Sequence, residues 1–120
     1  MKRLEIIIRP DKLEALKNIL NSRSVGGITV TSVMGCGKQK GGLTSGGPKG
    51  FKIKGVKVAG MNLLPKIQAS TIVEDSVVNE ILNIIHEKIS SGKVGDGKVF
   101  VSPVDDAMRI RTGERGKKAL

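Results

Sequence analysis

The most informative segment of this chain reads Ser91-Gly92-Lys93-Val94-Gly95-Asp96-Gly97-Lys98-Val99-Phe100-Val101. It joins an apolar pattern with helical spacing to a β-branched, strand-like run. Three glycines within six residues let the backbone turn sharply and approach another group closely, because glycine has no Cβ. Consecutive amides in such a loop bind anions, and Lys93 and Lys98 add positive charge beside them. The glycine spacing alone fits a plain turn equally well, so loop 91–98 is a candidate phosphate site.

Composition indicates one small domain over residues 1–120. Apolar residues make up 38% of the chain, and the only aromatic residues are Phe51 and Phe100, which predicts a thin core that relies on partner subunits. The net charge is +10, and no acidic residue lies between Glu14 and Glu74. Such a block indicates an anionic partner, which could be nucleotide phosphate, nucleic acid, a membrane surface or an acidic protein face.

The cysteine content and the hydropathy pattern indicate the cellular compartment. The single cysteine, Cys36, excludes a disulfide within the chain. No apolar run approaches the roughly 20 residues of a membrane span, and the N-terminus leads directly into a strand pattern without a signal peptide. We therefore expect a cytoplasmic protein that does not insert into a membrane.

The hydrophobic patterns predict two β-α-β units separated by a long loop. Asp11 and Glu14 form a capping-box pattern before the first helix, and Glu74, Asp75 and Ser76 supply capping groups before the second. The predicted strands are residues 4–9, 28–33, 66–73 and 99–101, and the predicted helices end near residues 22 and 90. This order predicts an α+β, ferredoxin-like βαββαβ fold, in which two helices cover one face of a four-stranded antiparallel sheet.

The other face of that sheet also needs cover, because the predicted strands are rich in apolar residues. Oligomerisation through the open face is the expected solution. The segment between the second and third strands holds seven glycines between Lys40 and Pro65, although Phe51–Lys54 and Val56–Val58 alternate as a loose hairpin around Gly55 would. We expect this segment to be mobile.

Catalytic residue sets are not evident in the sequence. His86 is the only histidine and falls on the second predicted helix, where a surface position is the usual case. Cys36 lies between two glycines, which indicates packing or close backbone approach rather than nucleophilic chemistry, and Asp105-Asp106 is typical of a solvated turn. The sequence therefore predicts a protein that is not an enzyme.

Arg109 and Arg111 alternate around Ile110, so in an extended segment both side chains point the same way. Two guanidinium groups on one face suit a polyphosphate, since arginine can bind it with two parallel hydrogen bonds. Taken alone, such a pair within the basic C-terminal segment 105–120 also fits ordinary surface.

The order Ser91, three residues, then Gly-Asp-Gly-Lys-Val-Phe-Val closely resembles the C-terminal signature of the P-II family of signal-transduction proteins. The resemblance covers nearly the whole chain and includes Val30–Val33, Gly35–Gly41, Leu64–Lys66 and Arg109–Glu114. It implies a homotrimer with inward-facing sheets that binds ATP and ADP in clefts between subunits. It also implies control of a target, such as a membrane transporter, a metabolic enzyme or a transcription regulator, through a long T-loop at residues 37–65.

The resemblance assigns nucleotide binding to positions from two neighbouring subunits. Position 38 is arginine in many members and lysine here, and Ser70 stands where the family often has a glutamate near the adenine. The matched positions are Gly35, Cys36, Gly37, Lys38, Ile72, Val94, Gly95, Gly97 and Lys98 in one subunit, with Thr29, Arg109 and Arg111 from its neighbour.

Some family members also sense 2-oxoglutarate together with Mg-ATP. Gln39 matches the glutamine that coordinates Mg²⁺ in those members, and the oxo-acid is held at positions matching Arg9, Lys66, Lys40 and Gly41. The sequence leaves this binding open, because the loop that folds over the ligand differs here.

The T-loop is the departure from the family pattern. Its usual tyrosine motif is replaced by Gly42–Lys52, and alignment at Lys66 makes the loop about eight residues longer than usual. The chain has no tyrosine, which excludes tyrosine uridylylation.

Three other classes share parts of this pattern. An RNA-binding module has the same topology, but it stacks bases on strand aromatics, and Phe100 is the only candidate, so nucleic acid is not the expected partner. An amino-acid-sensing domain would not need the Gly-Asp-Gly-Lys loop, and a structural subunit would use the glycines for turns only.

Overall fold

The computed structural model describes residues 1–37 and 63–120. The elements follow the predicted β-α-β order in each half, with short 3₁₀ turns (η) added. In chain order they are β1 (Lys2–Ile8), η1 (Pro10–Lys12), α1 (Leu13–Asn21), β2 (Thr29–Gly35), β3 (Leu64–Val73), η2 (Asp75–Val77), α2 (Val78–Ile89), β4 (Gly97–Pro103) and η3 (Gly116–Ala119).

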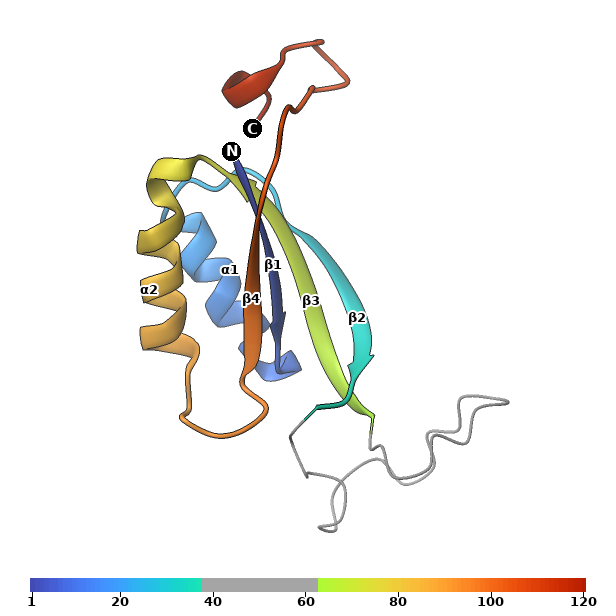
Figure 1. Ribbon diagram of the computed structural model, residues 1–120, viewed down its shortest axis with the longest axis vertical. Helices are drawn as coiled ribbons and strands as arrows, with labels where there is room; N and C mark the ends of the chain where they lie inside the picture. Colours follow the sequence, from blue (N-terminus) through green and yellow to red (C-terminus); the bar gives the residue numbers. More distant parts are fainter. Residues whose placement is uncertain (38–62) are drawn as a thin grey trace, which may run out of the picture.

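The four strands form one antiparallel sheet in the order β2-β3-β1-β4. Both helices lie on the same face of this sheet, as Figure 1 shows. The α+β, ferredoxin-like fold predicted from the sequence is therefore confirmed. Its two central strands, β1 and β3, belong to different β-α-β halves, so residues far apart in the sequence meet at the ends of the sheet.

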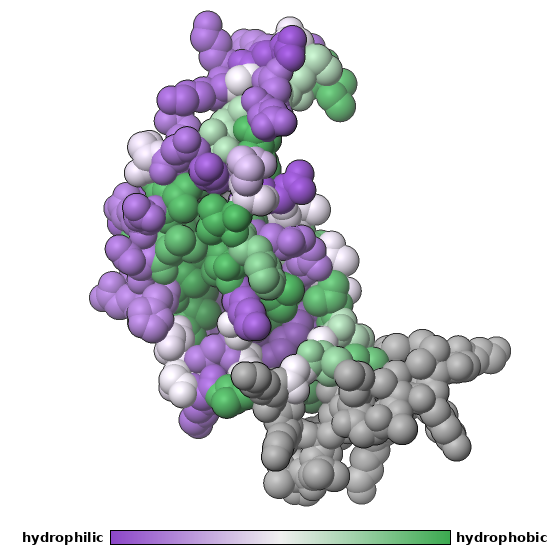
Figure 2. All heavy atoms as spheres, viewed as in Figure 1, coloured by the Kyte–Doolittle hydropathy of each residue, from purple (hydrophilic) through white to green (hydrophobic). Residues whose placement is uncertain are grey.

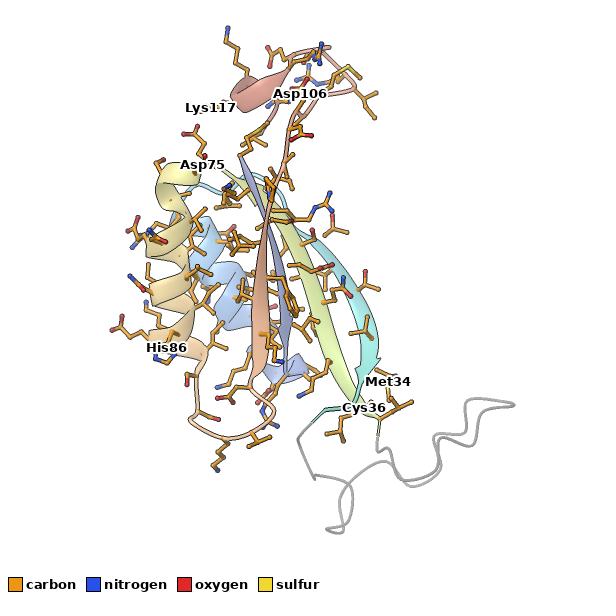
Figure 3. The ribbon with its side chains drawn as sticks, in the orientation of Figure 1. Met34, Cys36, Asp75, His86, Asp106 and Lys117 are labelled. Atoms are coloured by element: carbon orange, nitrogen blue, oxygen red, sulfur yellow. The ribbon has the colours of Figure 1, made fainter. Side chains whose placement is uncertain are left out.

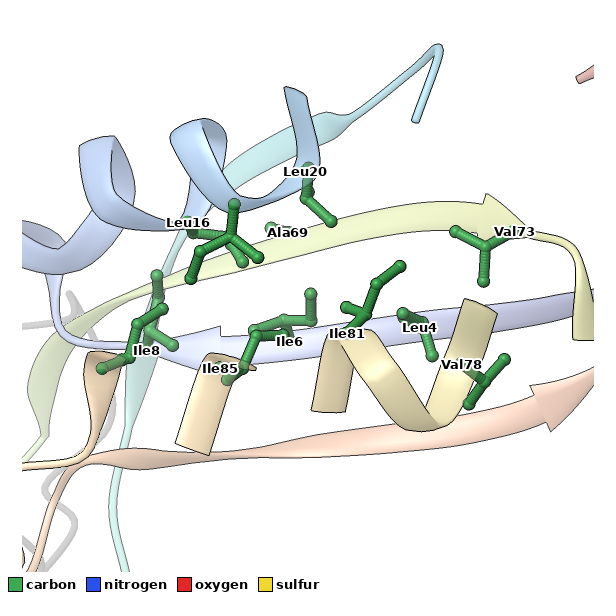
Figure 4. Packing of buried hydrophobic residues seen from close by; sticks show 12 residues of the cluster. Leu4, Ile6, Ile8, Leu16, Leu20, Ala69, Val73, Val78, Ile81 and Ile85 are labelled. Carbon is green, nitrogen blue, oxygen red and sulfur yellow. The ribbon is translucent and has the colours of Figure 1, made fainter. Parts of the chain in front are cut away.

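The core lies between the sheet and the two helices (Figure 4). Alternate residues of β1 point toward the helices, and Leu4 and Ile6 are fully buried there. Leu16 from α1 and Ile81 from α2 are equally inaccessible. Burying these apolar side chains removes them from water and supplies most of the stability that fixes the sheet.

The open face of the sheet is more polar than predicted. Strand pairing places Glu5, Gln68 and Lys98 on this face, and the Gln68 amide donates to Glu5 at 2.5 Å. The sheet directs most of its aliphatic side chains to the helix side, so the apolar content of the strands overstates the apolar area on the open face. Ile72 and Phe100 are among the apolar side chains that remain on the open face.

Apolar surface also remains near the edge strand β4. A groove between α2 and β4 is lined by Ile85, Ile89 and Val99, with His86 at its side. Figure 2 shows apolar side chains gathered in this part of the molecule. Phe100 is 51% exposed, so this edge carries apolar area without cover in the single chain.

The predicted helix caps are not formed. Lys12 and Val77 occupy the N-cap positions of α1 and α2, and neither helix has a side-chain cap hydrogen bond. A 3₁₀ turn precedes each helix, so the capping groups fall one turn too early. Glu14 instead accepts from Lys17 at 2.9 Å, and Asp75 pairs with the N-terminal ammonium at 3.0 Å.

The strands bordering the central loop extend further than the sequence indicated. Gly35 pairs with Leu64 and Met34 with Pro65, so both ends of the predicted loop belong to the sheet. The hairpin expected around Gly55 and most of T-loop 37–65 lie outside the described residues. Among the helices that the structure describes, none is long and apolar enough to cross a membrane.

Candidate functional site

Loop 91–98 is closed by its own aspartate. The Asp96 carboxylate accepts hydrogen bonds from the Ser91 hydroxyl at 2.5 Å, the Ser91 amide at 2.7 Å and the Gly92 amide at 3.1 Å. These bonds, those of Ser91 above all, hold the pKa of the Asp96 carboxyl below its ordinary value. The acidic residue therefore stabilises the loop from within rather than presenting a free charge to a ligand.

The glycines of this loop meet a steric requirement. Gly95 and Gly97 have φ values of 102° and 109°, a region that residues with a Cβ rarely occupy. A Cβ on Gly97 would lie 1.7 Å from the carbonyl oxygen of Ile7, because β4 begins there against β1. Gly97 is thus needed for the loop to enter the sheet.

Two basic residues at the end of the sheet bind the loop backbone. Arg9 Nη2 donates to the Val94 carbonyl at 2.8 Å, and Lys66 Nζ donates to the Gly95 carbonyl at 2.6 Å. Arg9 also lies 3.6 Å from the Asp96 carboxylate. Burial and the neighbouring Arg9 lower the pKa of Lys66, and Asp96 partly opposes that shift. The structure thus brings Arg9 and Lys66 together, but onto the loop.

The end of β2 lies at the same end of the sheet as this loop (Figure 1). A Cβ on Gly35 would lie 3.5 Å from Cγ of Lys66, so the backbone passes close to that side chain. Cys36, labelled in Figure 3, is exposed in the single chain and so does not pack into its core. Lys98 is exposed on the open face opposite Ile7.

A second group of predicted residues lies at the opposite end of the sheet. Thr29 begins β2, Ile72 pairs with Arg3 near the N-terminus, and Arg109 and Arg111 follow β4. The seven residues of β4 separate this end from loop 91–98 by about 20 Å. The assignment of Ile72 to the same subunit as Gly35 and loop 91–98 was wrong, because its place near the end of β3 puts it at the end of the sheet that carries Arg109 and Arg111. The predicted nucleotide-binding residues form two groups that cannot meet within one subunit.

Arg109 and Arg111 are not in an extended segment, contrary to the prediction. The Thr112 and Gly113 amides donate to the Arg109 carbonyl at 3.3 and 2.8 Å, which forms a turn. Arg109 Nη1 lies 3.2 Å from Glu114, and its Nη2 donates to the Leu120 carbonyl at 3.0 Å. Arg111 is exposed at the turn.

A family model described as nitrogen regulatory protein P-II matches residues 1–114 of this chain. The chain belongs to the P-II family. Nitrogen regulatory protein P-II 2 of Methanothermobacter thermautotrophicus is 42% identical over 100% of this chain and 97% of its own length. Nitrogen regulatory protein P-II of Azospirillum brasilense is 38% identical over the full length of both chains, and that of Cyanidium caldarium is 42% identical over 98% of this chain and 97% of its own.

Membership of the P-II family makes this chain a signalling regulatory protein. Four residues that the P-II resemblance assigned to ligands, Lys38, Gln39, Lys40 and Gly41, lie outside the described residues. Within residues 1–37 and 63–120, no cluster of three or more histidine, cysteine or acidic side chains could hold a metal ion.

Two features of this candidate site were missed in the sequence. The first is the role of Asp96 as the acceptor for Ser91 and Gly92, which the spacing of Ser91 and Asp96 around a glycine turn could have suggested. The second is the binding of loop carbonyls by Arg9 and Lys66. These contacts span 85 and 29 residues of sequence, so no local pattern could reveal them.

Proposed function

We propose that this P-II protein binds ATP and ADP competitively in clefts between the subunits of a homotrimer, and that it regulates a target protein through its T-loop without catalysing a reaction. The observation that carries the proposal is the separation of the candidate residues into two groups at opposite ends of the sheet. Loop 91–98 of one subunit and Arg109 and Arg111 of the next complete one site only in an assembly.

The loop supplies the chemistry for binding phosphate. Its glycine backbone brings amides close to an anion, and Lys98 adds a positive charge at the start of β4. Arg111 is exposed and available to a neighbouring subunit, and exchange of the Glu114 and Leu120 contacts would release Arg109 as well. Two guanidinium groups from the neighbour would then complete the charge that a polyphosphate requires.

The open sheet face supports the assembly. Ile7, Ile72 and Phe100 lie on this face and remain at least partly exposed in the single chain. A trimer with inward-facing sheets would bury this apolar area, and polar pairs such as Glu5 with Gln68 would fix the register of the subunits.

ATP and ADP would regulate the protein through the contacts by which they differ. β2 ends at Gly35, only two residues before the start of the T-loop at residue 37, so the additional phosphate of ATP would bias the base of the T-loop. Gln39 would hold Mg²⁺ next to the phosphates, as the family resemblance implies, and Mg²⁺ would neutralise phosphate charge there. Residues 37–65 contain several lysines and no acidic residue, which suits an acidic surface on the target, such as a transporter, an enzyme or a regulator in the cytoplasm.

RNA binding is the alternative function for a protein of this topology, but the residues of the sheet do not favour it. The two central strands, β1 and β3, contain no aromatic side chain on which a base could stack. Phe100 lies on the edge strand β4 and would provide one platform only.

Calorimetric titration with ATP, ADP and 2-oxoglutarate, the last with and without Mg-ATP, tests the proposal, with light scattering for the molar mass. We expect a trimer that binds both nucleotides at one set of sites, each displacing the other. Added heat from 2-oxoglutarate in Mg-ATP would identify a sensor of both energy and nitrogen state. A monomer, or a trimer without nucleotide binding, would refute the proposal.

A further inference from the structure

Two consecutive carbonyl groups in loop 91–98 accept hydrogen bonds from positively charged side chains at the end of the sheet. Arg9, the first residue after β1, donates to the Val94 carbonyl at 2.8 Å, and Lys66 of β3 donates to the Gly95 carbonyl at 2.6 Å. β1 and β3 are adjacent central strands and Ile8 pairs with Ile67, so Arg9 and Lys66 lie next to each other at one end of the sheet. The loop is thus held at two successive carbonyls.

This arrangement fixes where the loop amides point. The peptide bonds are trans, so each carbonyl and the amide that follows it point in opposite directions. With the Val94 and Gly95 carbonyls directed at Arg9 and Lys66, the Gly95 and Asp96 amides face away from them. Two adjacent amides that face the same side form an arrangement that binds anions.

The electrostatic cost of placing Arg9 next to Lys66 indicates that the fold holds these two side chains together for a purpose. Holding two cations close together is unfavourable, and burial with the nearby Arg9 lowers the pKa of Lys66. The loop carbonyls and the Asp96 carboxylate, which lies 3.6 Å from Arg9, offset that cost. Without the loop in this conformation, the two cations would lose these acceptors.

We infer that Arg9 and Lys66 are positioning residues of the phosphate-binding loop. They bind the Val94 and Gly95 carbonyls and thereby turn the Gly95 and Asp96 amides toward the nucleotide. This inference rests on the proposed nucleotide binding at the loop. It gives the two residues a role in binding ATP and ADP that does not require an oxo-acid ligand.

Two variant pairs test the inference. Lys66→Met and Arg9→Gln remove each donor, while Lys66→Arg and Arg9→Lys keep the charge and a donor. Lys88→Met is the matched control, because it removes one positive charge from the exposed last turn of α2. Hydrogen exchange of peptides spanning residues 91–98 is measured without nucleotide, and ADP affinity is measured by calorimetry on the same samples.

We expect Lys66→Met and Arg9→Gln to accelerate exchange in the loop about tenfold and to weaken ADP binding about tenfold, since each loses a charged hydrogen bond. Lys66→Arg should retain most of the loop protection and most of the ADP affinity, and Lys88→Met should change neither quantity. Wild-type exchange and affinity in both removal variants would overturn the inference while leaving the proposed function intact. Absence of ADP binding by the wild-type protein would instead overturn the proposed function, and this inference with it.

Weaker binding with unchanged loop exchange would also contradict the inference, because it would make Arg9 and Lys66 direct ligands only. If a removal variant fails to fold, Arg9→Lys keeps the test valid. A lysine keeps the charge but cannot reach both the Val94 carbonyl and the Asp96 carboxylate, so loop exchange should still be faster than in the wild type.

Discussion

Gly97 approaches the carbonyl of Ile7 so closely that a Cβ on Gly97 would lie 1.7 Å from that oxygen. Gly92, in the same loop, also has a positive φ, of 76°, but a Cβ there would have no atom within 4 Å. Substitutions at these two glycines therefore distinguish the effect of backbone strain from the effect of steric overlap.

Gly97→Ala should lower the free energy of unfolding by at least about 2 kcal/mol, because strain at positive φ and overlap with Ile7 act together. Gly92→Ala carries the strain alone and should cost about 1 kcal/mol. Urea denaturation of both variants measures the difference. Equal losses would show that the entry of the loop into β4 is not sterically restricted.

Asp96→Asn should destabilise the protein in a pH-dependent manner. The pKa of Asp96 is lowered in the folded protein, so its contribution is complete above its unfolded pKa of about 3.9 and is lost as pH falls through the lower folded value. The difference in unfolding free energy between wild type and variant should be constant from pH 7 to 5 and shrink below pH 4. A difference that does not change with pH would contradict the assignment, and Asp105→Asn, at an exposed aspartate outside the loop, is the control.

Lys66 should give nucleotide binding an alkaline limit. Its pKa lies below the ordinary value of 10.5, so it loses its proton at a lower pH than an unperturbed lysine would and then becomes a weaker donor to Gly95. Affinity for ADP should fall as pH rises through that lowered pKa, whereas the stability contributed by this group should rise, because the unfolded chain then binds more protons. Lys66→Arg should remove the decline, since arginine stays charged. A decline unchanged in that variant would assign it to another group.

An oxo-acid bound at Arg9 and Lys66 should compete with the loop backbone. A carboxylate can take these donors only by displacing the Val94 and Gly95 carbonyls, so 2-oxoglutarate without Mg-ATP should weaken ADP binding. Calorimetric titration of ADP at increasing 2-oxoglutarate measures the coupling. Tighter ADP binding in the presence of the oxo-acid would show that it does not displace the loop.

The sequence predicted what depends on local pattern. The apolar pattern predicted a strand at residues 4–9 and a helix ending near residue 90, and the structure buries Leu4 and Ile6 of that strand and Ile81 of that helix. The predicted cap of the first helix did not form because Asp11 lies within a 3₁₀ turn that precedes α1, and such a turn depends on how the chain leaves β1. The apolar area of the open face was overestimated, because a count of apolar residues does not say to which side of a strand they point.

The candidate site was predictable in part for the same reason. Gly97 and Lys98 could be named from the motif around them, but the partners of Val94 and Gly95 come from β1 and β3, which meet only in the folded sheet. The turn at Arg109 was missed because Glu114 and Leu120, which bind its guanidinium, come later in the chain.

The inter-subunit site is tested most directly by mixing two variants. Lys98→Ala and Arg111→Ala should each bind ADP weakly as pure trimers, because each removes a positive charge from every cleft. In trimers assembled from equal amounts of both, about a quarter of the clefts would combine an intact Lys98 with an intact Arg111 from the neighbour. Recovery of wild-type affinity in that fraction of sites is the predicted result, and no recovery in mixed trimers would contradict a site shared between subunits.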